Sequence, residues 1–137
     1  MELIYFTGRK TSGHDPLLRA MQFLAPARGL SIPPSIDEFS RKIAQSPARQ
    51  VLAVMKPRDE EALIDIYFTR CLFRRIPSIL VLPDRERHTS ALAFRIGPTR
   101  IFPCGTDHAE IAAAVSTFLS AWPDTTVHDP DKYSAAA

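Results

Sequence analysis

VLAVMKPRDEEALIDIYFTRCLFRRIPSILVL, residues 51–82, contains the pattern that decides the fold. Val51–Met55 and Ile79–Leu82 are short, continuous apolar runs, which are typical of strands buried on both faces of a sheet. Between them, residues 57–75 predict one long helix, because acidic side chains gather in its first turns and arginines at its end, a polarity that suits the helix dipole. Strand, helix and strand in this order predict a βαβ unit with two parallel strands.

The same alternation continues toward the N-terminus. Leu3–Phe6 is an apolar run that predicts a first buried strand, and the Asp-Pro pair at residues 15–16 supplies an N-cap and a first-turn proline for a helix. Residues 29–34 predict a weak strand, which their prolines restrict to the edge of a sheet. The Ser-x-x-Glu spacing of residues 35–38 is that of a capping box at the start of another helix.

The alternation also continues toward the C-terminus. Residues 89–96 predict a short helix closed by a Gly-Pro pair, and residues 99–102 predict the last strand. An Asp-x-x-Glu capping box at 107–110 begins a final helix, which Pro123 ends. The apolar residues of that helix recur at helical spacing: Ile111, Val115, Phe118 and Trp122. We therefore expect one domain over residues 1–122, followed by a polar C-terminal tail over residues 123–137.

Five predicted strands alternate strictly with five predicted helices, which indicates an α/β fold of three layers. Right-handed crossovers and a sheet covered on both faces favour the doubly wound, flavodoxin-like parallel sheet with strand order 2-1-3-4-5. Ligands of such sheets bind at the carboxyl ends of the strands. Those ends carry four dipeptides: Thr7-Gly8, Met55-Lys56, Pro83-Asp84 and Phe102-Pro103.

The composition excludes several classes of protein. The chain has 137 residues, of which 45% are hydrophobic and 23% charged, the balance of an ordinary globular domain. No apolar run approaches the roughly 18 residues of a membrane-spanning helix, and the N-terminus has no signal-peptide pattern, so we expect a cytoplasmic protein. Cys71 and Cys104 are too few for a disulfide framework and lack the spacing of a zinc motif. A net charge of +2 does not indicate a nucleic-acid-binding protein.

Two segments of the second half carry a resemblance to a known family. They are IPSILVLP at residues 76–83 and RIFPC at residues 100–104. The first resembles the fourth strand of the response-regulator receiver (CheY-like) domain family, with its leading proline, and the second resembles the fifth strand, which the family ends with lysine and proline. The similarity spans roughly residues 1–122. It implies a flavodoxin-like signalling domain of bacterial two-component systems, which acts by contact with a protein partner or a second copy.

The receiver family's phosphorylation chemistry needs particular groups at the strand ends. Two acids and an aspartate hold magnesium, that aspartate takes the phosphoryl group, and a hydroxyl and a lysine bind its oxygens. Carried over to this sequence, the acid pair falls on Thr7 and Gly8, or on Phe6 and Thr7 if the register shifts by one residue. The phosphoacceptor falls on Met55, or on Lys56 in the shifted register, the hydroxyl on Pro83 and the lysine on Phe102. None of these residues is an acid, so the resemblance implies a pseudo-receiver with no catalytic residue, metal or cofactor. Asp84 is the carboxylate for which the sequence offers no structural role, whereas Asp15 and Asp59 have the positions of helix caps.

The loop after the first strand supports an alternative function. It joins a strand to a helix and carries hydroxyls, glycine and two cations that favour anion binding: Thr7, Gly8, Arg9, Lys10, Thr11 and Ser12. This alternative is a phosphate- or nucleotide-binding domain, or an enzyme, of flavodoxin-like fold. The loop lacks the spacing of a P-loop, and a solvated turn also explains it.

Further side chains have both a functional and a structural interpretation. Cys104 follows the last strand, where His108 and a helix start favour a reactive thiol, but unpaired cysteines also pack as small apolar residues. The arginines Arg70, Arg74, Arg75, Arg85 and Arg87 predict either a basic edge for nucleic acid or an ordinary solvated surface. By resemblance, the partner face runs through Phe94, Arg95 and Arg100, and a homodimer through this face stays open.

Overall fold

A computed structural model of the chain describes residues 2–8, 15–25, 29–45 and 51–121. Its five strands are β1 (Glu2–Phe6), β2 (Leu30–Ser31), β3 (Val51–Met55), β4 (Ser78–Val81) and β5 (Arg100–Phe102). The helices are α1 (Pro16–Leu24), α2 (Ile36–Gln45), α3 (Glu60–Phe68), the 3-10 helix η1 (Arg70–Phe73), α4 (Arg87–Ile96) and α5 (His108–Ala121). The strands pair in parallel in the order β2-β1-β3-β4-β5, which confirms the predicted doubly wound sheet.

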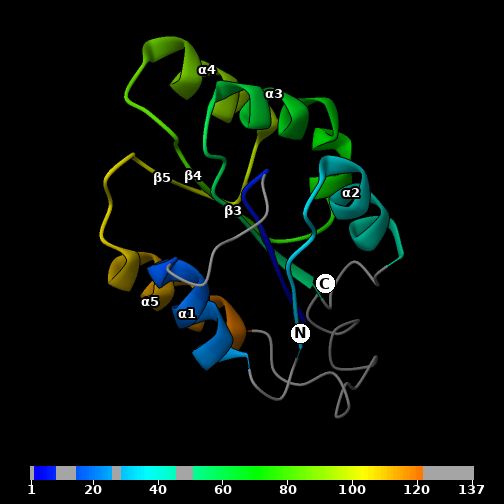
Figure 1. Cartoon of the computed structure of the whole chain (residues 1–137), viewed down its shortest axis with the longest axis vertical. Helices are drawn as coiled ribbons and strands as arrows, with labels where there is room; N and C mark the ends of the chain where they lie inside the picture. Colours follow the sequence, from blue (N-terminus) through cyan, green and yellow to red (C-terminus); the bar gives the residue numbers. More distant parts are fainter. Residues whose placement is uncertain (1, 9–14, 26–28, 46–50, 122–137) are drawn as a thin grey trace, which may run out of the picture.

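The sheet lies between two layers of helices. Figure 1 shows α1 and α5 on one side of the sheet and α2, α3 and α4 on the other. Successive residues of a strand point to opposite faces, and β1 divides accordingly. Leu3 and Tyr5 belong to the core under α1 and α5, whereas Ile4 and Phe6 belong to the core under α2, α3 and α4. Both faces of the central strands are therefore buried, which is why the strands read as continuous apolar runs.

Aromatic side chains connect α2 and η1 to the sheet. The ring of Phe6 in β1 stacks on the ring of Phe39 in α2 with centroids 4.6 Å apart. The centroid of the Phe39 ring is also 5.6 Å from that of Phe73 in η1. At the amino end of β1, the Glu2 carboxylate accepts a hydrogen bond from the Ser31 hydroxyl at 2.7 Å and pairs with Lys42 of α2 at 3.1 Å. These contacts hold the edge strand β2 and the helix α2 against the centre of the sheet.

The predicted helix over residues 57–75 is wrong in extent. The Asp59 carboxylate accepts a hydrogen bond from the Ala62 N–H at 2.9 Å, so Asp59 is the N-cap and α3 begins at Glu60. At the other end, Thr69 is the C-cap of α3, and its N–H bonds the Ile66 carbonyl three residues back at 3.0 Å, the hydrogen-bond pattern of a 3-10 turn. The chain then continues as η1, which carries Phe73 into the core. The backbone changes from α-helical to 3-10 hydrogen bonding at Thr69, within a segment that helical pattern alone predicted as continuous.

The predicted helix ends at Asp15, Ser35 and Gly97 are confirmed, whereas the Asp107 carboxylate accepts from the Ala109 N–H at 3.0 Å and not from the Glu110 N–H that the predicted capping box required. Asp15 accepts from the N–H groups of Leu17 and Leu18 at 3.0 and 3.3 Å, and the Ser35 hydroxyl accepts from the Glu38 N–H at 3.3 Å. Gly97 closes α4 in the left-handed conformation, with φ +72°. Trp122, Pro123 and the predicted tail lie outside the described residues.

None of the helices in the described part of the chain is long and apolar enough to cross a membrane.

Candidate functional site

The carboxyl ends of β1 and β3 lie side by side. Phe6 is opposite Met55 in the sheet, and the Lys56 N–H donates a hydrogen bond to the Phe6 carbonyl at 2.8 Å. One step further, the Arg58 N–H donates to the Thr7 carbonyl at 3.2 Å. The structure therefore brings two of the four predicted strand-end dipeptides together, at the point where the strand order reverses between β1 and β3.

The ends of β4 and β5 complete this edge. Val81 is opposite Phe102, and the Leu82 N–H donates to the Phe102 carbonyl at 2.9 Å. Pro83 is the next residue along β4's exit. The half-buried Cys104 thiol donates to the Pro83 carbonyl at 3.5 Å and so joins the two exits. The residues onto which the resemblance carried a phosphorylation site thus all lie along one edge of the sheet.

Most of this edge is filled by core side chains. Met55 is fully buried and packs in the core under α2, α3 and α4, and Phe102 is buried under α1 and α5. Thr7 is also buried. Lys56 is half-buried at the point where β3 ends, and it is followed by the exposed Arg58. The edge therefore combines an apolar floor with cationic side chains from the exit of β3.

Gly8 is required here by packing as well as by backbone conformation. Its φ of +86° lies in the region that favours glycine, and a Cβ at this position would be 2.6 Å from the Cβ of Ala62 in α3. The sequence suggested Gly8 as a degenerate phosphorylation-site position and as part of an anion-binding loop. The structure shows that it lets the exit of β1 approach α3 closely.

The three carboxylates that the sequence singled out near the edge all bond to backbone N–H groups. Asp15 and Asp59 cap α1 and α3 as predicted. Asp84, for which the sequence offered no structural role, accepts a hydrogen bond from the Glu86 N–H at 3.0 Å. This hydrogen bond forms an Asx turn, which directs the chain from β4 toward α4. Asp84 therefore has a structural role, which corrects the expectation from the sequence. In the described part of the chain, no three His, Cys, Asp or Glu side chains cluster closely enough to hold a metal ion.

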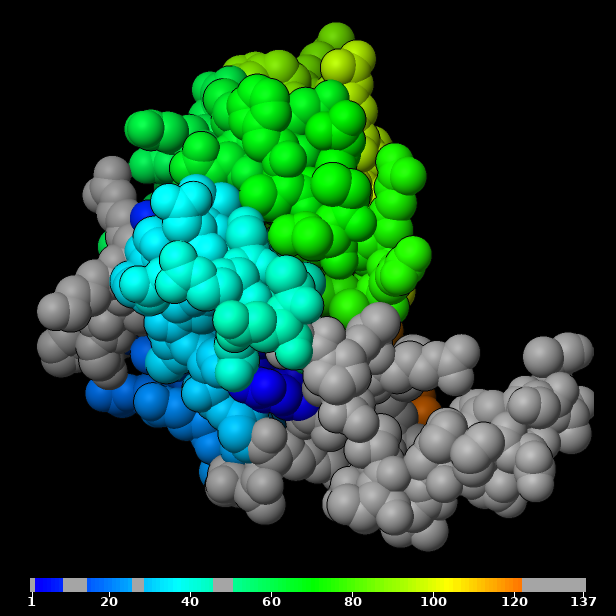
Figure 2. Space-filling view, turned by 90° about the vertical axis from the view of Figure 1, so that its right-hand side faces the viewer, coloured from blue at the N-terminus to red at the C-terminus, as the bar shows by residue number. Residues whose placement is uncertain are grey.

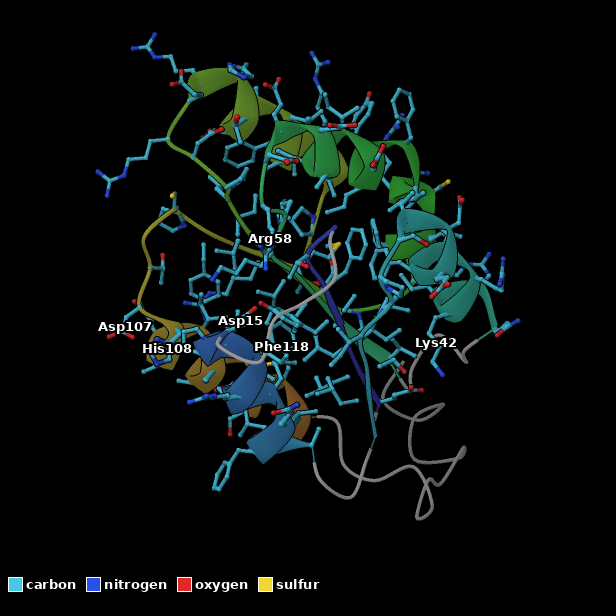
Figure 3. The ribbon with its side chains drawn as sticks, viewed as in Figure 1. Asp15, Lys42, Arg58, Asp107, His108 and Phe118 are labelled. Carbon is cyan, nitrogen blue, oxygen red and sulfur yellow. The ribbon has the colours of Figure 1, made fainter. Side chains whose placement is uncertain are left out.

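Tyr5 is a polar member of the edge that sequence reasoning missed. Its side chain is fully buried, and its hydroxyl donates to the Asp15 carboxylate at 2.7 Å. Burial, and then the hydrogen bond and negative charge of Asp15, raise the pKa of Tyr5, while the positive charge of Arg58 opposes this shift. Asp15, at the start of α1, and Arg58, after β3, are labelled in Figure 3. A tyrosine inside an apolar strand needs a partner for its hydroxyl, and that signal was available in the sequence.

The structure describes only part of the predicted anion-binding loop, but it describes both residues of the reactive-thiol hypothesis, Cys104 and His108. Thr7 and Gly8 belong to the edge just described, whereas Arg9, Lys10, Thr11 and Ser12 lie outside the described residues. The His108 side chain, which the sequence suggested as a helper for Cys104, has its Nδ1 3.6 Å from an oxygen of Asp107 (Figure 3). The thiol of Cys104 bonds a backbone carbonyl, as a packed cysteine does.

The predicted partner-face residues do not form one surface: Phe94 and Arg95 lie on different flanks of α4, and Arg100 lies on β5. His88 Nε2 is 3.2 Å from a carboxylate oxygen of Glu60, so the His88 flank of α4 faces α3. Arg95 is two helical turns after His88 and shares that flank, whereas Phe94 is turned away from it. Phe94 is 77% exposed. Arg100, on the edge strand β5, lies with its guanidinium carbon 4.5 Å from the centroid of the Phe102 ring.

The predicted basic edge divides into two groups. Arg74 and Arg75 precede β4 and therefore lie at the amino end of the sheet, whereas Arg85 and Arg87 follow β4 at the carboxyl end. Arg70 stacks on Tyr67, with its guanidinium carbon 4.1 Å from the ring centroid. The five arginines thus do not form one continuous strip, because β4 separates them along its length.

Solved structures with this architecture are known. A CheY-like protein, TadZ, from Pseudomonas aeruginosa PAO1 superposes with a TM-score of 0.56 at 10% identity, covering 87% of this chain and 100% of that one. A response regulator CheY-like protein from Mesorhizobium loti superposes with a TM-score of 0.57 at 17% identity, covering 86% and 98%. No model of a known protein family matches the sequence, and no curated protein matches it. At these identities the likeness concerns the fold.

Proposed function

On the premise that the chain has the CheY-like receiver fold, we propose that it is a cytoplasmic signalling module that binds a protein partner without being phosphorylated and without acting as an enzyme. Fold alone does not determine function, so the proposal rests on the carboxyl edge of the sheet. There the resemblance carries the acid pair of a phosphorylation site onto Thr7 and Gly8, its phosphoacceptor onto Met55 or Lys56, its hydroxyl onto Pro83 and its lysine onto Phe102. We interpret the chain as a pseudo-receiver.

The buried Met55 side chain is the observation that carries this proposal. A phosphoacceptor must reach a metal ion and a phosphoryl donor, both of which arrive from solvent. Met55 ends β3 with no exposed surface, and its thioether cannot form an acyl phosphate. If the alignment to the receiver family shifts by one residue, the phosphoacceptor position falls on Lys56, whose positive charge repels magnesium. Asp84 is occupied by its turn hydrogen bond, which argues against it as a displaced acceptor.

The proposed partner face consists of the flank of α4 that is turned away from α3, together with the edge strand β5. Phe94 exposes a large apolar surface there, and β5 has no strand beyond it in the described sheet. Exposed aromatic and arginine side chains are both enriched at protein interfaces. Arg100 is exposed and held against the Phe102 ring, which reduces the entropy that it loses on binding.

Two measurements test this function. Incubation with acetyl phosphate and magnesium, followed by intact-mass analysis, should give no added phosphoryl group; a labile aspartyl phosphate would overturn the proposal. A partner recovered by crosslinking in the native host should bind the Phe94→Ser and Arg100→Ala variants roughly tenfold more weakly, as expected for loss of interface anchors. Arg95→Ala is the matched control on the other flank and should retain binding. Equal binding by all three variants would remove this face from the proposal.

The cationic exit of β3 favours one second candidate, an anion site for a phosphate or nucleotide. Lys56 and Arg58 lie beside Thr7 and Gly8, so a phosphate at this edge would meet positive charge. A thermal-shift screen of simple phosphates, nucleotides and flavin tests it. Stabilisation of the wild type but not of an Arg9→Ala/Lys10→Ala variant would support this candidate, and no stabilisation by any of these ligands would exclude it.

A further inference from the structure

The helix α3 has apolar residues on both of its faces. Ala62, Leu63 and Ile66 face the core and are buried. Ile64 and Phe68, four residues apart, lie together near the middle of the opposite face, because residues at this spacing lie one above the other on a helix. Ile64 is 38% exposed and Phe68 is 72% exposed. In Figure 2 the green surface of α3 and η1 lies on the outside of the molecule next to the cyan α2.

Charged side chains are divided along this face. The acidic residues all precede Ile66, and they are Glu60, Glu61 and Asp65. The basic residues all follow Phe68, and they are Arg70, Arg74 and Arg75. We call the whole surface, from Glu60 to Arg75, the α3 face. It has an acidic end, an apolar centre and a basic end.

The fold accounts for only part of this arrangement. Acids in the first turn and bases after the last turn complement the helix dipole, so the order of the charges has a local explanation. The exposure of Ile64 and Phe68 has no such explanation in the fold. Neither side chain belongs to the cores on either side of the sheet. A solvated helix normally presents polar residues at these positions.

One arginine of the basic end is already held in place. The Arg70 guanidinium lies over the Tyr67 ring at 4.1 Å, and its Nη1 donates to the Tyr67 carbonyl at 3.0 Å. The Tyr67 ring in turn meets the Phe68 ring edge-on at 5.7 Å. The apolar centre and the start of the basic end are therefore joined in one packed cluster, which loses little side-chain entropy on binding.

We propose that the α3 face binds the α3 face of a second copy of this chain about a two-fold axis. In such a contact the two helices run antiparallel, so each acidic end meets the partner's basic end while Phe68 and Ile64 pack at the centre. An isologous contact requires a surface that is complementary to itself, and the division of charge about an apolar centre meets that requirement. The proposal is separate from the partner face on α4 and β5. One helix and one short 3-10 helix give a small contact, so the association is expected to be weak.

Charge exchange provides the sharpest test. Sedimentation equilibrium of the full chain at low salt should show a monomer–dimer equilibrium. Glu61→Arg and Arg74→Glu should each weaken it roughly tenfold, because each creates like-charge contacts at both ends of the dimer. An equimolar mixture of these two variants should dimerise like the wild type, since in the mixed dimer both contacts join opposite charges. The double variant should also dimerise.

Phe68→Ser tests the apolar centre, with Phe94→Ser as the matched control on α4. Phe68→Ser should weaken dimerisation by roughly tenfold or more, as expected for a central anchor, and Phe94→Ser should leave it unchanged. Circular dichroism and denaturant unfolding check that each variant is folded. A wild type that stays monomeric at all concentrations would overturn the proposal. So would a mixture of charge variants that fails to dimerise, or a dimer that Phe94→Ser dissociates and Phe68→Ser does not.

Discussion

The carboxyl edge of the sheet and the α3 face differ in where they put apolar side chains. At the carboxyl edge, where doubly wound domains usually have polar groups for ligands, Met55 and Phe102 are buried in the two cores. On the α3 face, where a helix usually meets solvent with polar groups, Ile64 and Phe68 are exposed. The difference favours a molecule that works by contact through its helix surfaces over one that works by chemistry at its strand ends.

Met55→Asp should have the largest effect on stability. It would put a carboxylate at the expected phosphoacceptor position, but inside an apolar core, at a loss of about 4 kcal/mol or more in the free energy of unfolding. Urea denaturation measures this loss. Lys56→Asp, one residue further and half-buried, is the control and should change stability by about 1 kcal/mol or less. A stable Met55→Asp variant that gains a phosphoryl group from acetyl phosphate would show that the edge still holds a receiver pocket.

Gly8→Ala should rank second. The added Cβ would lie 2.6 Å from Ala62, at a φ of +86° that alanine rarely adopts. We expect a loss of about 3 kcal/mol in unfolding free energy. Gly97→Ala is the matched control, because Gly97 also has a positive φ but no neighbouring atom within 4 Å of its added Cβ. It should lose about 1 kcal/mol, the conformational part alone. Equal losses would mean that close approach to α3 does not constrain the edge.

Tyr5→Phe should have a smaller effect, which depends on pH. Loss of the hydrogen bond to Asp15 should lower the unfolding free energy by about 1 kcal/mol at neutral pH. Because the pKa of Tyr5 is raised in the folded state, the unfolded chain releases the tyrosine proton first as pH rises above its ordinary value of 10.0. The stabilising contribution is therefore complete below that pH and is lost above it.

Denaturant unfolding of the wild type and Tyr5→Phe between neutral pH and about pH 11 tests this sign. The wild type should lose stability more steeply than the variant above the ordinary tyrosine pKa. Parallel pH profiles would indicate that Tyr5 ionises in the folded protein as readily as in the unfolded chain, and that the edge is more open than its burial suggests.

Phe68→Ser and Phe94→Ser should change stability least, by about 0.5 kcal/mol or less in either direction, because both side chains are mostly exposed. Thermal and denaturant unfolding of dilute protein, where self-association is negligible, measures this. A loss of several kcal/mol in either variant would show that the aromatic ring packs within the monomer. The comparison between a buried edge and an exposed apolar helix face would then fail.

Much of the fold was predictable because local patterns report it directly. The continuous apolar runs of β1, β3 and β4 showed burial on both faces, and Asp15, Ser35 and Gly97 marked helix ends. The division of residues 57–75 into α3 and η1 was missed, since it is a change of backbone hydrogen bonding at Thr69 that the apolar pattern does not record. The turn role of Asp84 was missed for a similar reason: it is a hydrogen bond to a backbone group two residues away.

The candidate sites depended more on tertiary structure. The sequence listed Phe94 and Arg95 as one face, but neighbouring residues on a helix point in different directions, and the contact between His88 and Glu60 shows which flank of α4 is occupied by α3. One interpretation of the sequence joined the five arginines into one basic edge. In the structure β4 lies between Arg74 and Arg75 at one end and Arg85 and Arg87 at the other. Tyr5 and Asp15 are ten residues apart, and only the packing of α1 on the sheet makes them partners.

By itself, the sequence determined the alternation of strands and helices and the residues at the strand ends, because hydrophobic period and caps act over a few residues. The strand order followed from the topology rules that apply to such an alternation. Tertiary structure alone decided which strand-end side chains are buried, which carboxylate accepts the hydrogen bond of the Tyr5 hydroxyl, and which helix face exposes apolar side chains to solvent. Those properties depend on contacts between segments distant in the chain. No local pattern encodes them, since one residue has the same neighbours in sequence whether its side chain meets a core or water.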